Sequence, residues 1–115
     1  MKKPLVYVAG PYTRGDVSRN VQRALQVGDE VYANGGVPIV PHLSHLWDLI
    51  DPKPYEHWME LDFDLLESCQ ALLRFEGDSP GAEREIDHAQ ELGIPVFYNM
   101  PDLLNWILVR EVNSE

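Results

Sequence analysis

The stretch that decides the fold is "ALLRFEGDSPGAEREIDHAQELGIPVFY", which spans residues 71–98. It opens with the apolar run ALLRFEG and closes with IPVFY, and both runs are typical of short, buried parallel strands. Between them, Ser79 stands as a helix N-cap, Pro80 occupies the first helical position and Gly93 marks the stop. This order of strand, helix and strand predicts a βαβ unit.

The same alternation continues towards both ends of the chain. Two further apolar runs and three further helical segments complete the pattern: the runs span residues 5–10 and 37–41, and the helices span residues 16–36, 56–69 and 101–112. Residues 42–55 are polar and aromatic and are expected to form a loop. The pattern predicts an α/β fold with a three-layer, doubly wound parallel sheet of four to five strands, flavodoxin-like or Rossmann-like.

Length and charge limit the function classes. The chain has 115 residues, which suits one domain with one core, and nineteen acidic residues against nine basic ones give a net charge of −10. This charge repels nucleic-acid polymers and anionic membranes, although backbone amides can still hold a small anion. The single cysteine, the lack of a signal peptide and the lack of a membrane-spanning apolar run lead us to expect a soluble, cytoplasmic protein.

Two carboxylates fall on apolar helix faces. At about 100° per residue, Glu85 lies between Ala89 and Leu92, and Asp62 lies near the middle of a face made by Trp58, Met59, Leu61, Phe63, Leu65 and Leu66. Each acid has a structural interpretation, Asp62 as the cap of a neighbouring loop and Glu85 as a partner of turn amides in the first helical turn. Two inward acids beside one predicted ligand edge favour a functional interpretation instead.

Paired acids in different environments suit glycosyl transfer, in which one acid is the nucleophile and the other is the proton donor. A nucleophilic carboxylate must be ionised, and we expect the N-terminus of its helix to keep Glu85 in that form. A proton donor must hold its proton near neutral pH, and we expect desolvation to raise the pKa of Asp62.

Three segments carry a resemblance to a known family. They are VYVAGP over residues 6–11, DFDLLESCQA over residues 62–71 and SPGAEREIDHAQELGIPV over residues 79–96. The chain resembles the nucleoside 2-deoxyribosyltransferase-like superfamily, and within it a small bacterial and phage branch. The resemblance implies that residues 1–115 form a single domain of this kind, which cleaves or exchanges the N-glycosidic bond of a (deoxy)nucleoside or its 5′-monophosphate.

The resemblance also implies roles for individual residues. Glu85 takes the position of the nucleophile, which forms a covalent glycosyl-enzyme intermediate, and Asp62 matches the second acid, which assists departure of the base or positions the substrate. Tyr7 matches a first-strand tyrosine that orients the nucleophile, and its alternative is a core aromatic packed in the sheet.

Substrate contacts are expected from the loops. Residues 10–16 include Gly10, Pro11 and Arg14, and with Ser79 and Gly81 they correspond to a region that contacts sugar or phosphate in relatives. The alternative is a solvated loop arginine with an ordinary N-cap serine. His42 and Trp47 are expected to border a nucleobase pocket, unless their loop packs for its own sake.

No cofactor is expected, because the chain has neither a Walker loop nor a Gly-x-Gly-x-x-Gly signature. His42 and His45, with His57 or His88, form a possible metal set, but their spacing does not favour one. The expected partners are a small-molecule nucleoside or nucleotide and further copies of the chain, as a homo-oligomer (dimer or tetramer). The last helix either serves that interface or packs on its own sheet.

The sequence departs from the family pattern at two positions: Asp87 stands where relatives often have Gly, and Gln70 where they often have Asp. Both departures bear on the shape of the pocket. The alternatives to an enzyme are a non-catalytic nucleotide-sensing module and a structural homo-oligomeric protein.

Overall fold

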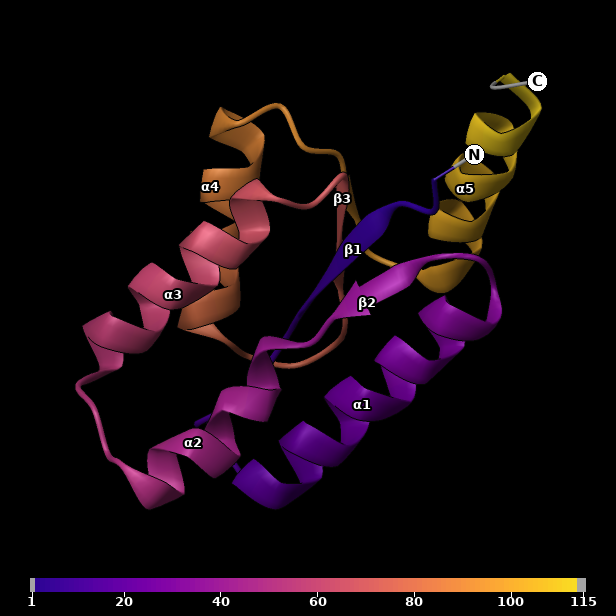
Figure 1. Cartoon of the computed structure of the whole chain (residues 1–115). Helices are drawn as coiled ribbons and strands as arrows, with labels where there is room; N and C mark the ends of the chain where they lie inside the picture. Colours follow the sequence, from indigo (N-terminus) through magenta and orange to yellow (C-terminus); the bar gives the residue numbers. More distant parts are fainter. Residues whose placement is uncertain (1, 114–115) are drawn as a thin grey trace.

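A computed structural model describes residues 2–113, which form one parallel sheet with helices on both faces (Figure 1). The sheet has four strands in the order β2-β1-β3-β4, namely β1 (Leu5–Ala9), β2 (Val37–Ile39), β3 (Ala71–Arg74) and β4 (Val96–Phe97). All three strand pairings are parallel, and Val6 of β1 pairs with Pro38 of β2 and with Ala71 of β3. The expected α/β class is confirmed.

Helices α1 (Val17–Ala33) and α5 (Met100–Asn113) pack on one face of the sheet, and α3 (Tyr55–Glu67) and α4 (Pro80–Glu91) pack on the other. The alternation of side chains along β1 divides the interior into two cores. Val6 and Val8 belong to the core shared with α1 and α5, whereas Tyr7 and Ala9 belong to the core shared with α3 and α4. This is the three-layer, doubly wound arrangement that the sequence predicts.

The strand order places a topological switch point between β1 and β3. The chain leaves β1 towards β2 on one side and later leaves β3 towards β4 on the other, so the connections diverge at the carboxyl ends of these two neighbours. Open α/β sheets bind ligands in the crevice that such a divergence creates. The loops after β1, β2 and β3 therefore meet at the edge where the sequence predicts a site.

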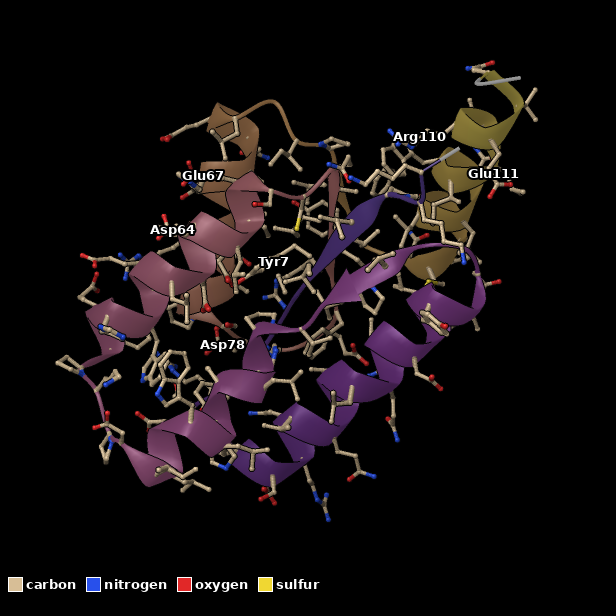
Figure 2. All side chains as sticks on the ribbon, in the orientation of Figure 1. Tyr7, Asp64, Glu67, Asp78, Arg110 and Glu111 are labelled. Atoms are coloured by element: carbon tan, nitrogen blue, oxygen red, sulfur yellow. The ribbon has the colours of Figure 1, made fainter. Side chains whose placement is uncertain are left out.

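The ends of α4 follow the sequence signals. The hydroxyl of Ser79 accepts a hydrogen bond from the Ala82 amide at 3.0 Å, which makes it the N-cap, and Pro80 is the first helical residue. Gly93 has a φ of 75°, a left-handed conformation that favours glycine after a helix. Figure 2 shows Tyr7 inside the molecule and Asp64 on the outer side of α3, in agreement with the burial of the one and the exposure of the other.

One predicted loop is wrong. Within residues 42–55 the chain forms the end of a 3-10 helix, η1 (Pro41–Leu43), and then α2 (Ser44–Ile50). Helix α2 buries none of its residues, and its apolar side chains, such as Ile50 at 86% exposed, face outward. A seven-residue helix without a buried stripe shows no clear helical period, which is why the sequence suggested a loop.

Two leucines that helical periodicity places on buried faces are more exposed than expected: Leu65 is 36% exposed and Leu92 is 45% exposed. Helix α5 packs on its own sheet through Leu103 and Ile107, while Leu108 and Val112 remain exposed. Within residues 2–113, every helix is too short or too polar to cross a bilayer.

Candidate active site

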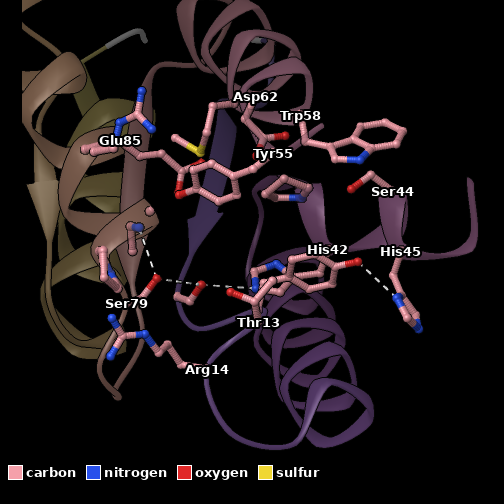
Figure 3. Close-up of a pocket in the computed structure, with 18 of the residues that line it drawn as sticks. Thr13, Arg14, His42, Ser44, His45, Tyr55, Trp58, Asp62, Ser79 and Glu85 are labelled. Carbon is pink, nitrogen blue, oxygen red and sulfur yellow. Dashed lines mark hydrogen bonds between the residues drawn. The ribbon is translucent and has the colours of Figure 1, made fainter. Parts of the chain in front are cut away.

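A cavity of about 690 Å³ opens at the predicted edge of the sheet (Figure 3). Its walls come from the loop after β1, from η1 and α2 after β2, from α3, and from the first turns of α4. A volume of this size suits a small-molecule ligand. Glu85 and Asp62 both line this cavity, so two helices bring the two inward carboxyls together.

Glu85 is 5% exposed and accepts a hydrogen bond through its Oε2 from the hydroxyl of Tyr7. It is the sixth residue of α4 and so lies in the second turn, not in the first turn where the sequence analysis placed it. The influence of a helix dipole falls off within the first turn. The Tyr7 phenol on β1, and not a set of turn amides, is therefore the polar partner of this carboxyl.

Asp62 projects from α3 into the same cavity. Its Oδ1 is buried and has no hydrogen-bond partner among residues 2–113. Burial raises the pKa of Asp62 from 3.8 to about 7, as the sequence analysis expected. A buried carboxyl oxygen without a partner in the protein lowers stability, and such groups are uncommon in folded proteins.

The pKa of Glu85 is raised as well, from 4.5 to about 8. Desolvation is the main cause, the hydrogen bond from Tyr7 opposes it, and the nearby Asp62 adds to it. The expectation that Glu85 stays ionised while only Asp62 holds a proton is therefore wrong for the free protein. The direction of the shift favours the protonated carboxyl near neutral pH in the free protein.

The residues predicted to contact sugar or phosphate have partners of their own. Arg14 lines the cavity but forms an ion pair with Asp78 at 2.9 Å, and both side chains are largely exposed. The Ser79 hydroxyl caps α4 and lies 3.5 Å from the Gly10 carbonyl. A Cβ on Gly81 would come within 2.9 Å of the Tyr55 hydroxyl, so a larger residue there would have to displace this side chain. A contact of these residues with phosphate stays a prediction.

Of the two residues expected at a base pocket, one lines the cavity. His42 is buried, and its Nε2 donates to the carbonyl of Pro11 at 2.9 Å, with the Gly10 carbonyl at 3.2 Å. Trp47 does not line the cavity, because it packs behind Trp58 with a ring separation of 5.1 Å. Trp58 is the indole on the cavity wall, so the assignment of Trp47 is corrected.

Pro11, also expected among the substrate contacts, contributes its carbonyl to His42 but does not line the cavity. The loop that holds it is pinned by Asn20, whose side-chain amide donates to the carbonyls of Tyr12 and Arg14 at 2.9 and 2.7 Å. Sequence reasoning missed Asn20, because its role depends on the path of the loop.

Sequence reasoning also missed the wall formed by α2. Ser44 and Asp48, four residues apart on one helix face, line the cavity, as does His45. The Tyr12 hydroxyl and His45 Nδ1 lie 2.9 Å apart and join this wall to the loop after β1. If residues 44–50 had been recognised as a helix, the i, i+4 spacing of Ser44 and Asp48 would have placed both on one helix face.

The family departures lie away from the cavity. Gln70 accepts a hydrogen bond from the Leu5 amide at 2.7 Å, and Asp87 is exposed on α4. Across the described part of the chain, no group of three or more His, Cys, Asp and Glu is arranged to hold a metal ion.

Comparisons with known proteins add a family and a fold. Residues 4–99 match the family described as "Domain of unknown function (DUF7768)". No curated protein matches the sequence.

Two solved structures have a similar fold. One is a 2-deoxyribosyltransferase from the psychrotolerant bacterium Bacillus psychrosaccharolyticus, with a TM-score of 0.61 and 20% identity, matched over 80% of this chain and 69% of that one. The other is a 2-deoxyribosyltransferase from Leishmania mexicana, with a TM-score of 0.58 and 19% identity, matched over 81% of this chain and 61% of that one. The chain therefore spans less than two thirds of the length of the second structure, and the likeness concerns the fold.

Proposed function

We propose that this chain, which belongs to the family described as Domain of unknown function (DUF7768), is an enzyme. Its proposed reaction is cleavage of the N-glycosidic bond of a (deoxy)nucleoside or its 5′-monophosphate. The proposal takes residues 1–115 as one domain that belongs to the nucleoside 2-deoxyribosyltransferase-like superfamily and acts as a homo-oligomer. The reaction is that of the two similar structures, both of which are 2-deoxyribosyltransferases. The observation that carries the proposal is the pair of carboxyls, Glu85 and Asp62, in one cavity at the switch point of the sheet.

In the first step, an ionised Glu85 oxygen attacks C1′ of the sugar and forms an ester bond. The electron pair of the C1′–N bond passes to the base nitrogen, and the base takes the proton of Asp62. Asp62 suits this role because its raised pKa, about 7, lets it carry a proton near neutral pH. The Tyr7 hydroxyl donates to Glu85 and so stabilises its charged form and fixes its orientation.

In the second step, water or an acceptor base attacks C1′ from the side that the first base has left. The bond between C1′ and Glu85 breaks with its electron pair returning to the carboxylate, and the proton of the attacking group passes to Asp62. Both acids are then restored. Water gives a hydrolase and a second base gives a transferase.

Release of free base tests the proposal. The full chain is incubated with deoxynucleosides and their 5′-monophosphates, and the bases are separated by chromatography. We expect release by the wild type, and a loss of at least about 10³-fold in Glu85→Ala because a nucleophile is removed. Glu91→Gln is the matched control, since Glu91 is an exposed acid on the same helix. Equal release by the wild type and Glu85→Ala would refute the mechanism.

A second measurement looks for the covalent intermediate. Acid-quenched protein is digested and weighed by mass spectrometry, and we expect the peptide that contains Glu85 to gain the mass of the sugar. The raised pKa of Glu85 also favours a second candidate, a binding module without turnover, because a protonated carboxyl is no nucleophile. That candidate predicts thermal stabilisation by a nucleotide without release of base.

A further inference from the structure

The α2 wall of the cavity holds one carboxylate in a fixed position. Oδ1 of Asp48 accepts two hydrogen bonds, from Trp58 Nε1 at 2.8 Å and from the Lys53 amide at 3.1 Å. These two donors come from the segment that follows α2 and from α3, so they fix the position of the carboxylate. The same hydrogen bonds lower the pKa of Asp48 below its usual 3.8, and it stays ionised when Asp62 and Glu85 hold protons.

The other oxygen of this carboxylate is uncommitted. Asp48 lines the cavity, and within residues 2–113 its Oδ2 accepts no hydrogen bond. An ionised carboxylate only accepts hydrogen bonds. A ligand that brings an N–H or O–H donor to this oxygen gains a hydrogen bond to a charged acceptor, whereas a ligand acceptor placed there gains none.

The cationic groups of the cavity have acidic partners of their own. The three basic side chains on its wall are each paired with an acid that does not line it: Arg14 with Asp78, Lys53 with Asp51, and Arg84 with Glu56. These ion pairs occupy only part of the donors on the three side chains, whereas the Asp48 Oδ2 accepts no hydrogen bond within residues 2–113. At Asp48 the wall therefore offers a charged acceptor to a ligand.

We infer that Asp48 is a specificity-determining residue that favours nucleobases with an exocyclic amino group over their keto counterparts. The inference rests on the proposed function, because it takes the ligand to be a nucleoside. Cytosine and adenine present an N–H₂ donor where uracil, thymine and hypoxanthine present a carbonyl oxygen. A donor meets the Asp48 Oδ2 favourably, and a carbonyl oxygen meets it with like-charge repulsion.

Two pairs of substrates isolate this effect. Deoxycytidine and deoxyuridine differ in the group at position 4, and deoxyadenosine and deoxyinosine differ in the group at position 6. For each pair we expect kcat/KM of the wild type to favour the amino base by about 10-fold or more, the range of one hydrogen-bonded base contact.

Asp48→Asn is the matching variant. Its Oδ1 still accepts from Trp58 and Lys53, so the wall is retained, while the atom that replaces Oδ2 becomes an N–H₂ donor. We expect the amino preference to vanish or reverse, with the keto substrate gaining about 10-fold relative to its partner. Asp51→Asn is the control, because Asp51 binds Lys53 at 2.8 Å but does not line the cavity.

The outcomes separate the two proposals. Base release without an amino preference in the wild type, or with an unchanged preference in Asp48→Asn, overturns the inference and leaves the proposed function standing. If no substrate releases base, the proposed function fails, and thermal shifts with deoxycytidine and deoxyuridine decide the inference. Greater stabilisation by deoxycytidine that is lost in Asp48→Asn supports it, and equal stabilisation overturns it.

Discussion

Replacing Glu85 with Gln should make the protein more stable in alkaline solution. The folded pKa of Glu85, about 8, lies above its ordinary value of 4.5 because the carboxyl is desolvated. The folded state therefore binds a proton that the unfolded state releases. This contribution to stability is fully present below about pH 4.5 and is lost as the pH rises through about 8. Gln keeps an acceptor for the Tyr7 hydroxyl and has no charge to bury.

The magnitude follows from the interval between the two pKa values. From 4.5 to about 8, at 1.36 kcal/mol per pH unit, the full effect is about 5 kcal/mol, of which about 4 kcal/mol falls between pH 5 and pH 9. With an unfolding entropy of about 2.1 cal/mol/K per residue, 1 kcal/mol moves the Tm of a 115-residue chain by about 4 °C. The Tm difference between Glu85→Gln and the wild type should thus grow by about 15 °C across this range.

Scanning calorimetry at one-unit steps from pH 5 to pH 9 measures this difference. The comparison of the two proteins at each pH removes the contribution of Asp62 and of the overall charge to first order. Glu91→Gln serves as the control, because this exposed acid ends α4 and should give an offset that does not change between pH 6 and pH 9. A constant offset for Glu85→Gln would show that its carboxyl is ionised throughout and would refute the account of its burial.

Three further predictions concern the site and its support. The pH profile of kcat/KM should be bell-shaped with limbs near pH 7 and pH 8, since activity needs Glu85 ionised and Asp62 protonated. Asp62→Asn should abolish the alkaline limb when it is assayed with a substrate that has a good leaving group. In the wild type the hydrogen bond from Tyr7 lowers the pKa of Glu85, so Tyr7→Phe should raise that pKa and move the acid limb to higher pH. Chemical denaturation of this variant should show a free energy of unfolding reduced by about 1–3 kcal/mol. Gly10→Ala should lower the Tm by about 4–12 °C in calorimetry, since a Cβ there would come within 2.2 Å of the Phe75 ring; an unchanged Tm would show that the ring moves freely.

The sequence was sufficient for the framework because local rules govern it. The cap at Ser79, the stop at Gly93 and the apolar strands are decided by neighbouring residues, and the structure has each of them. The inward position of Glu85 also follows from helical periodicity, and its burial confirms it. Helical periodicity gives the direction of a side chain, and this was enough to predict that Glu85 and Asp62 both face the same edge of the sheet.

What lies in the cavity wall depends on packing that no local pattern encodes. The sequence analysis placed Trp47 at a base pocket and Trp58 on an apolar helix face, yet Trp58 lines the cavity and Trp47 packs against it. The pKa of Glu85 depends in the same way on what surrounds it in three dimensions. A first-turn position suggested an ionised group, whereas burial in the second turn raises the pKa of Glu85 and favours the protonated form.

The absence of buried residues in α2 bears on how such proteins diversify. Ser44 and His45 line the cavity without belonging to either hydrophobic core, so mutations there leave both cores intact, whereas Asp48 also holds the indole of Trp58. Tyr7 and Glu85, by contrast, sit inside a core where most replacements are purged. The residues of the α2 wall can therefore change the choice of ligand while Tyr7 and Glu85 stay the same.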